Sequence, residues 1–145
     1  MYIKGIGMTK FGIQEDATNH LVYESTLEAL NDADISMNDV EVIVTSSIEM
    51  MSNGERQKHT ASMISSLFQK KVPILSLPAG CAGGGTALWT AIKLQKSDNY
   101  NNILVIGFDR IIANTSKKVT DEILMGGERI YEQTEGLNFP AQNAL

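Results

Sequence analysis

Short apolar runs alternate with longer segments of helical spacing over the first 110 residues of the chain. The short runs are rich in β-branched and aromatic residues and predict strands at 2–6, 40–44, 72–77 and 102–108. Apolar positions recurring every three or four residues predict helices over 19–34 and 57–69, and a third helix that runs from the glycine-rich turn at 80–85 to about 96. The expected N-cap of the first helix is Asn19. One face of this helix is expected to carry Val22, Thr26, Ala29, Leu30 and Ala33.

Strand–helix units repeated in this way are typical of an α/β fold. We expect a mostly parallel sheet with helices on both faces and right-handed crossovers. Numbered along the chain, the strands are predicted to lie in the order 3-2-1-4. Pro73 lies in the third strand, and because proline cannot donate to the ladder, this favours an edge position.

The alternating pattern ends after Arg110. We therefore predict one α/β domain over 1–110 and the start of a second, loop-rich domain over 111–145. One short helix is expected near 120–125. Pro140 near the end predicts the first turn of another helix, so the chain is expected to be cut short there.

Composition narrows the classes of function. The chain has 145 residues, a net charge of −5 and only isolated lysine pairs, which disfavours nucleic-acid binding. The longest apolar run, 103–108, is too short to span a membrane, and the first residues predict no secretory signal. The single cysteine excludes an internal disulfide and a multi-cysteine zinc site, so we expect a reduced, cytoplasmic setting and no metal.

The strongest chemical signal is the glycine-rich segment around that cysteine. Cys81 follows a predicted strand and opens a predicted helix, where free N–H groups and the helix dipole favour a thiolate. This is the arrangement of a nucleophile elbow with cysteine in place of serine, and the Cys81 N–H is a candidate oxyanion donor. A buried structural cysteine is the alternative. A phosphate loop is disfavoured because 80–85 matches neither glycine motif and no lysine follows.

The sequence resembles the N-terminal half of a thiolase. The resemblance rests on Cys81-Ala82-Gly83-Gly84-Gly85-Thr86-Ala87-Leu88 and on 102–110 one helix later. Residues 5–12 resemble the start of archaeal and sterol-carrier-protein-type thiolases, and 136–141 is similar to a segment of their loop domain. The resemblance implies that Cys81 accepts an acyl group from acetyl-CoA or a related acyl-CoA as substrate, without a further cofactor. It identifies no coenzyme A-binding residue.

The family's catalytic histidine and second cysteine come from a later half that is not present here. His20 and His59 are the only histidines, and neither matches the family's histidine motif. We therefore expect the isolated chain to be inactive. Two alternatives stay open: a natural split subunit whose C-terminal half is a separate chain, or a fragment of a longer chain. We also expect a homodimer through Val72–Leu77, because this apolar edge strand is open to pairing and because thiolases join their subunits through the corresponding strand.

The resemblance implies an acyltransferase of the acetyl-CoA C-acetyltransferase type. One alternative is a condensing enzyme of the ketoacyl or hydroxymethylglutaryl-CoA synthase type, which shares the cysteine turn but uses different later partners. Another is a non-catalytic thiolase-like subunit. Asp109 follows the fourth strand at the carboxyl end of the sheet, where ligands bind in open α/β folds, but a structural role is expected for it.

Overall fold

The chain folds as helices alternating with strands. The structure is a computed structural model that describes residues 2–48, 55, 59–111, 116–128, 130–136, 141 and 144. The helices and strands are α1 (Thr18–Asp32), β1 (Val42–Ser46), α2 (Thr60–Phe68), β2 (Ile74–Ser76), α3 (Gly83–Lys96), β3 (Ile103–Gly107) and α4 (Ser116–Leu124). Three short 3₁₀ turns are described as well: η1 (Met37–Asp39), η2 (Gly80–Ala82) and η3 (Gln133–Glu135).

Two compact units divide the chain. The first comprises residues 1–49 and 57–109, and the second comprises 50–56 and 110–145. The first unit holds the sheet and helices α1 to α3, and the second holds α4 and η3.

The sheet is parallel and has the order β2-β1-β3 among the described strands. β1 pairs with β2 from Ile43↔Ile74 to Thr45↔Ser76, and with β3 from Val42↔Ile103 to Ser46↔Gly107. The predicted α/β class is confirmed, and the third predicted strand lies at an edge beside the second, as expected. The second predicted strand, however, pairs directly with the fourth.

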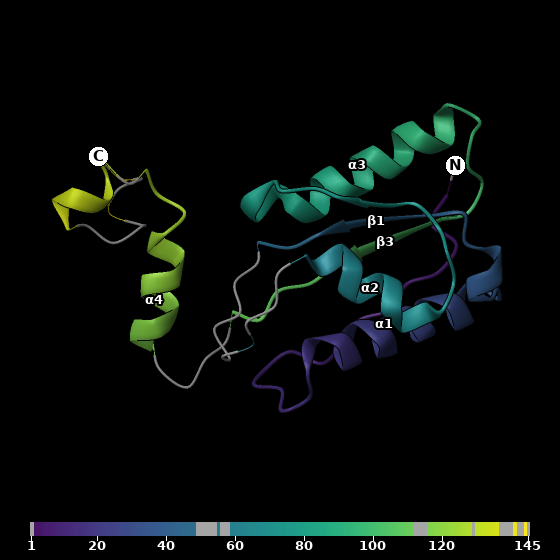
Figure 1. The fold of residues 1–145 in the computed structure, drawn as a ribbon, viewed down its shortest axis with the longest axis horizontal. Helices are drawn as coiled ribbons and strands as arrows, with labels where there is room; N and C mark the ends of the chain where they lie inside the picture. The colour runs from purple at the N-terminus through teal and green to yellow at the C-terminus, as the bar shows by residue number, and fades with distance from the viewer. Residues whose placement is uncertain are drawn as a thin grey trace. The chain divides into compact units, whose positions relative to one another are not determined.

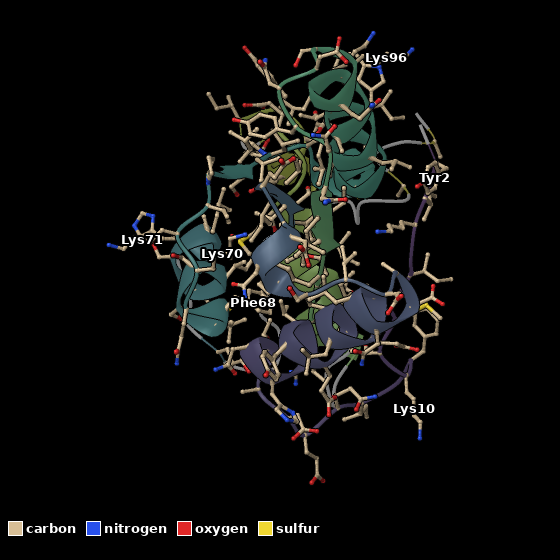
Figure 2. All side chains as sticks on the ribbon, turned by 90° about the vertical axis from the view of Figure 1, so that its right-hand side faces the viewer. Tyr2, Lys10, Phe68, Lys70, Lys71 and Lys96 are labelled. Atoms are coloured by element: carbon tan, nitrogen blue, oxygen red, sulfur yellow. The ribbon has the colours of Figure 1, made fainter. Side chains whose placement is uncertain are left out.

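The prediction of a strand at 2–6 is wrong. Residues 2–10 form no regular secondary structure, and the Ile6 and Met8 N–H groups donate to the carboxylates of Asp32 and Glu28 on α1, both at 2.9 Å. The segment therefore satisfies backbone donors on a helix instead of in the sheet. Figure 2 shows it running along the outside of the unit between the labelled Tyr2 and Lys10, and Tyr2 is 79% exposed.

Each face of the sheet packs against its own helices. Ile43 belongs to a core cluster with Val22 and Leu30 of α1 and Ile64 of α2, whereas Val44 packs with Ala87 and Ala91 of α3. Successive strand residues point to opposite faces, so both sides of β1 are covered and all five of its residues are buried. Figure 1 shows α3 on one side of the strands and α1 and α2 on the other.

The helices begin and end close to the predicted positions. The expected face of α1 is buried at Val22, Thr26, Leu30 and Ala33, each at most 8% exposed, whereas Ala29 is only half-buried. The expected cap is wrong: the N-cap is Ala17, which has no side-chain cap, and the Asn19 side chain accepts from the His20 N–H. Helix α2 begins at Thr60, and 57–58 of the predicted helix lie outside the described residues.

In the second unit, α4 covers Ser116–Leu124 and so starts before the predicted 120–125. The Gln133 side-chain amide donates to the carbonyls of Leu124 at 3.3 Å and Gly127 at 2.9 Å, which satisfies acceptors at the end of α4. The helical turn expected at Pro140 lies mostly outside the described residues.

Within the described parts of the chain, no helix has the length and apolar character needed to cross a membrane.

The contact of the N-terminal segment with α1 depends on glycine. A Cβ placed on Gly7 would lie 2.0 Å from the Ser25 carbonyl oxygen and 2.6 Å from the Ala29 nitrogen, both backbone atoms. We predict that Gly7→Ala lowers the free energy of unfolding by about 1–3 kcal/mol, because the segment must move off the helix. Urea denaturation measures this change.

Gly107→Ala is the matched control, since a Cβ there would meet no atom within 4 Å. We expect it to change stability by less than about 0.5 kcal/mol. Equal stability of the two variants would show that the N-terminal segment is not packed on α1 as described.

Candidate active site at the Cys81 turn

Cys81 lies where the carboxyl end of the sheet meets the start of α3. Three residues after β2 the chain enters η2 (Gly80–Ala82), and α3 follows without a break. Gly80 has φ +51, a left-handed conformation that L side chains rarely adopt, so glycine suits the sharp turn before the cysteine. Cys81 is a free, exposed thiol. The structure thus places it at the strand–turn–helix junction expected from the sequence.

The backbone N–H groups after the cysteine are used within the turn itself. The Ala82 N–H donates to the Ala79 carbonyl at 3.1 Å, and the Gly83 N–H donates to the Gly80 carbonyl. The Cys81 N–H takes no part in these two bonds. It stays the candidate oxyanion donor of this turn.

Ser46, the last residue of β1, contacts the segment that carries Cys81 on both sides of the cysteine. Its hydroxyl donates to the Leu77 carbonyl at 2.9 Å, and only 3% of the residue is exposed. A Cβ on Gly83 would come within 2.1 Å of the Ser46 Oγ. Sequence reasoning did not single out Ser46, because a serine at the end of a valine-rich run gives no local sign of a partner 31 residues away.

Asp109 joins the ends of β1 and β3. Its Oδ1 accepts from the Ser47 hydroxyl at 3.0 Å and from the Ile48 N–H at 2.8 Å. Burial raises the pKa of this carboxyl, and the two hydrogen bonds oppose that shift. The described contacts agree with the structural role expected for Asp109.

The two histidines lie on other elements. His20 is exposed on α1, with Nδ1 3.5 Å from an Asp16 oxygen and Nε2 3.8 Å from a Glu24 oxygen. His59 is the N-cap of α2 in a left-handed conformation, φ 55. Among the described residues, no group of three or more His, Cys, Asp and Glu side chains is arranged to hold a metal ion.

A separate cavity of about 360 Å³ lies in the first unit along the outer edge of β3. The N-terminal segment, α1 and α3 form its other walls. Cys81 is not among the described residues that line it, so this cavity is distinct from the cysteine turn.

Comparison with known proteins points to condensing enzymes. No family model matches the chain. It is 34% identical over 119 residues to β-ketoacyl-[acyl-carrier-protein] synthase III of Fusobacterium nucleatum, covering 81% of this chain and 34% of that protein. The synthase III of Staphylococcus haemolyticus is 28% identical over 119 residues, with 81% and 35% covered. The chain thus spans about a third of the length of these curated relatives.

Solved structures similar to this chain include a condensing enzyme as well. The 3-oxoacyl-[acyl-carrier-protein] synthase III of Aquifex aeolicus aligns with a TM-score of 0.56 and 26% identity, covering 65% of this chain and 30% of that one. The OleA protein of Xanthomonas campestris, solved with lauric acid and lauroyl-CoA, aligns with a TM-score of 0.60 over 91% of this chain and 38% of its own, at 16% identity. The fold is therefore thiolase-like, and it is shared with these condensing enzymes.

The sterol-carrier-protein type of thiolase expected from the sequence is not the type that these comparisons name. The curated relatives are synthase III enzymes, so they favour the condensing-enzyme alternative over an acetyl-CoA acetyltransferase.

The raised pKa of Asp109 predicts a specific pH dependence of stability. Between its ordinary value of 3.8 and the higher folded value, the unfolded chain releases this proton first, so stability falls as pH rises through that window. Asp109→Asn keeps an acceptor oxygen but does not titrate. We predict that the free energy of unfolding of Asp109→Asn, minus that of the wild type, increases between about pH 3 and about pH 6.

Urea denaturation at each pH measures this difference. Asp39 and Glu41, whose pKa values are lowered mainly by hydrogen bonds from Ser36 and from the Asn101 and Asn102 backbone, contribute equally to both proteins and cancel. A difference that stays flat or decreases with pH would contradict the assignment.

Proposed function

We propose that this chain carries the acyl-accepting part of a condensing enzyme similar to β-ketoacyl-[acyl-carrier-protein] synthase III, with Cys81 as the nucleophile. The observation that carries the proposal is the exposed Cys81 on a glycine-rich turn between a parallel strand and a helix. The condensing-enzyme relatives support the same reading.

The proposed half-reaction is a simple acyl transfer. The Cys81 thiolate attacks the carbonyl carbon of an acyl-CoA thioester and forms a C–S bond, which places the negative charge on the carbonyl oxygen. The Cys81 N–H stabilises that oxyanion. The intermediate then breaks its bond to the coenzyme A sulfur, which leaves as a thiolate and takes up a proton, and the acyl group remains on Cys81.

The condensing step needs further groups. The histidine and second cysteine that the thiolase resemblance implies have no counterpart among the described residues around Cys81. We propose that they come from a further C-terminal half, either on a separate chain or on a longer one, and that the 145 residues alone accept an acyl group without completing a catalytic cycle. Loss of general acid–base help of this kind costs about 10²–10⁴-fold in rate.

A homodimer through β2 is part of the same proposal. Among the described strands β2 pairs only with β1, so its other edge is open. Leu75, at the centre of β2, is 38% exposed. A second copy can pair with this edge antiparallel about a two-fold axis, because such a contact is self-complementary.

Acylation of Cys81 is the direct test of the proposed function. After incubation with acetyl-CoA or a longer acyl-CoA, intact mass spectrometry is expected to show one acyl group per chain and no continued release of coenzyme A. Cys81→Ser removes the only thiol of the chain and is expected to abolish the adduct. An adduct that persists in Cys81→Ser, or no adduct on the wild type with any acyl-CoA, would contradict the proposal and favour a non-catalytic subunit.

The dimer predicts a measurable effect of charge at β2. Sedimentation equilibrium at tens of micromolar protein is expected to give twice the chain mass of 15.8 kDa. Leu75→Lys is expected to reduce it to the monomer mass, because the new charges would face each other in the paired edge.

Leu27→Lys on α1 is the matched control, since Leu27 is 39% exposed and Leu75 is 38% exposed. We expect it to leave the dimer intact. A wild-type mass near 15.8 kDa would reject the dimer, and dissociation by both variants would reject its placement at β2.

A further inference from the structure

Ser46 holds the segment that carries Cys81 at two points. Its hydroxyl donates to the Leu77 carbonyl, four residues before the cysteine, and its side chain lies against Gly83, two residues after it. We propose that Ser46 is a positioning residue for Cys81: it fixes where the turn leaves the sheet and how closely α3 begins behind it. The proposal rests on the proposed function of Cys81 as acyl acceptor.

The Ser46 hydroxyl adds a hydrogen bond between β1 and the segment that follows β2. Backbone pairing between β1 and the β2 segment ends with the Leu77 N–H donating to the Thr45 carbonyl at 2.9 Å. The Ser46 hydroxyl then donates to the Leu77 carbonyl at 2.9 Å, which extends the connection by one bond towards the turn.

Ser46 also bonds to the segment that follows β3. Its backbone carbonyl accepts from the Phe108 N–H at 3.3 Å, just beyond β3. Ser46 therefore touches the ends of β2 and β3 and the first turn of α3 while it is itself 3% exposed. A buried hydroxyl with a satisfied hydrogen bond has one favoured orientation, because the alternative leaves a buried polar group unpaired.

Gly83 makes this close approach possible. A Cβ at Gly83 would lie 2.1 Å from the Ser46 Oγ and 3.1 Å from its Cβ. An alanine there would push the hydroxyl away from the Leu77 carbonyl. By contrast, a Cβ on Gly84 or Gly85 would meet no atom within 4 Å, so the requirement for glycine in this run is specific to Gly83.

The neighbouring Ser47 provides a matched control. Its hydroxyl donates to Asp109 Oδ1 at 3.0 Å, so the same serine-to-alanine change one residue further removes a different contact. Ser47→Ala therefore reports the general cost of losing a hydroxyl at the end of β1.

The rate of Cys81 alkylation by iodoacetamide at pH 7 tests the proposal on the full chain. This reaction does not require acyl transfer, so it separates failure of the positioning role from failure of the proposed function. We expect Ser46→Ala to slow alkylation by about threefold, because the turn no longer holds the thiol in one place at the start of α3. Ser47→Ala is expected to follow the wild type.

A double-mutant cycle with Gly83→Ala tests the geometry. Gly83→Ala alone is expected to slow alkylation as Ser46→Ala does, since it displaces the hydroxyl. Added to Ser46→Ala, it is expected to have little further effect, because the hydroxyl that it would displace is already gone. Additive effects would overturn the proposal.

The remaining outcomes are equally decisive. If Ser46→Ala folds and its alkylation rate equals that of the wild type, Ser46 does not position Cys81. If neither Ser46→Ala nor Gly83→Ala folds, Ser46 serves the fold alone and the proposal is overturned. If the alkylation results are as expected but no acyl-CoA acylates Cys81, the positioning role stands and the proposed function fails.

Discussion

Parallel pairing on both sides of β1 is the constraint on which the rest of the first unit depends. In a parallel sheet the carboxyl ends of all strands lie at the same end of the sheet. Ser46 therefore contacts Leu77 and Phe108 there, although these residues are far apart in the sequence. The pairing also buries all five residues of β1 between helices on opposite faces of the sheet. The carboxyl end of the sheet is therefore held in place by the buried strand β1. The cysteine turn leaves the sheet at this carboxyl end, beside the fully buried strand β1.

A turn held in this way is suited to acyl transfer. An exposed thiol is accessible to a bulky thioester, while the residues before and after it are fixed by a buried serine and by close packing at Gly83. Such preorganisation matters because a nucleophile and an oxyanion donor act together only when both keep their places during the reaction. In the proposed function, the second half-reaction would draw on groups outside the described residues around Cys81. This fits a chain that spans about a third of the length of its curated relatives.

The sequence predicts the parts of this arrangement that are encoded locally. Helical spacing identifies the buried face of α1, and the glycine-rich run after an apolar segment places Cys81 between a strand and a helix. Prediction from the sequence fails where contacts between residues far apart in the chain determine the structure. Residues 2–6 have the composition of a strand, yet the carboxylates of Asp32 and Glu28 and the close fit of Gly7 hold the segment on α1. Ser46 has no local signature, since its partner is 31 residues away.

The most direct test of the central claim is protection of Cys81 by a coenzyme A thioether that resembles the acyl substrate but cannot transfer its acyl group. If the cysteine turn is the acyl-binding site, a concentration about ten times the dissociation constant slows iodoacetamide alkylation of Cys81 by about tenfold, because the occupied site excludes the reagent. Protection by free coenzyme A, which lacks the acyl group, is measured in the same way and shows how much of the protection comes from the acyl group. An alkylation rate that does not change at any thioether concentration would show that acyl-CoA does not bind at Cys81 and would contradict the account.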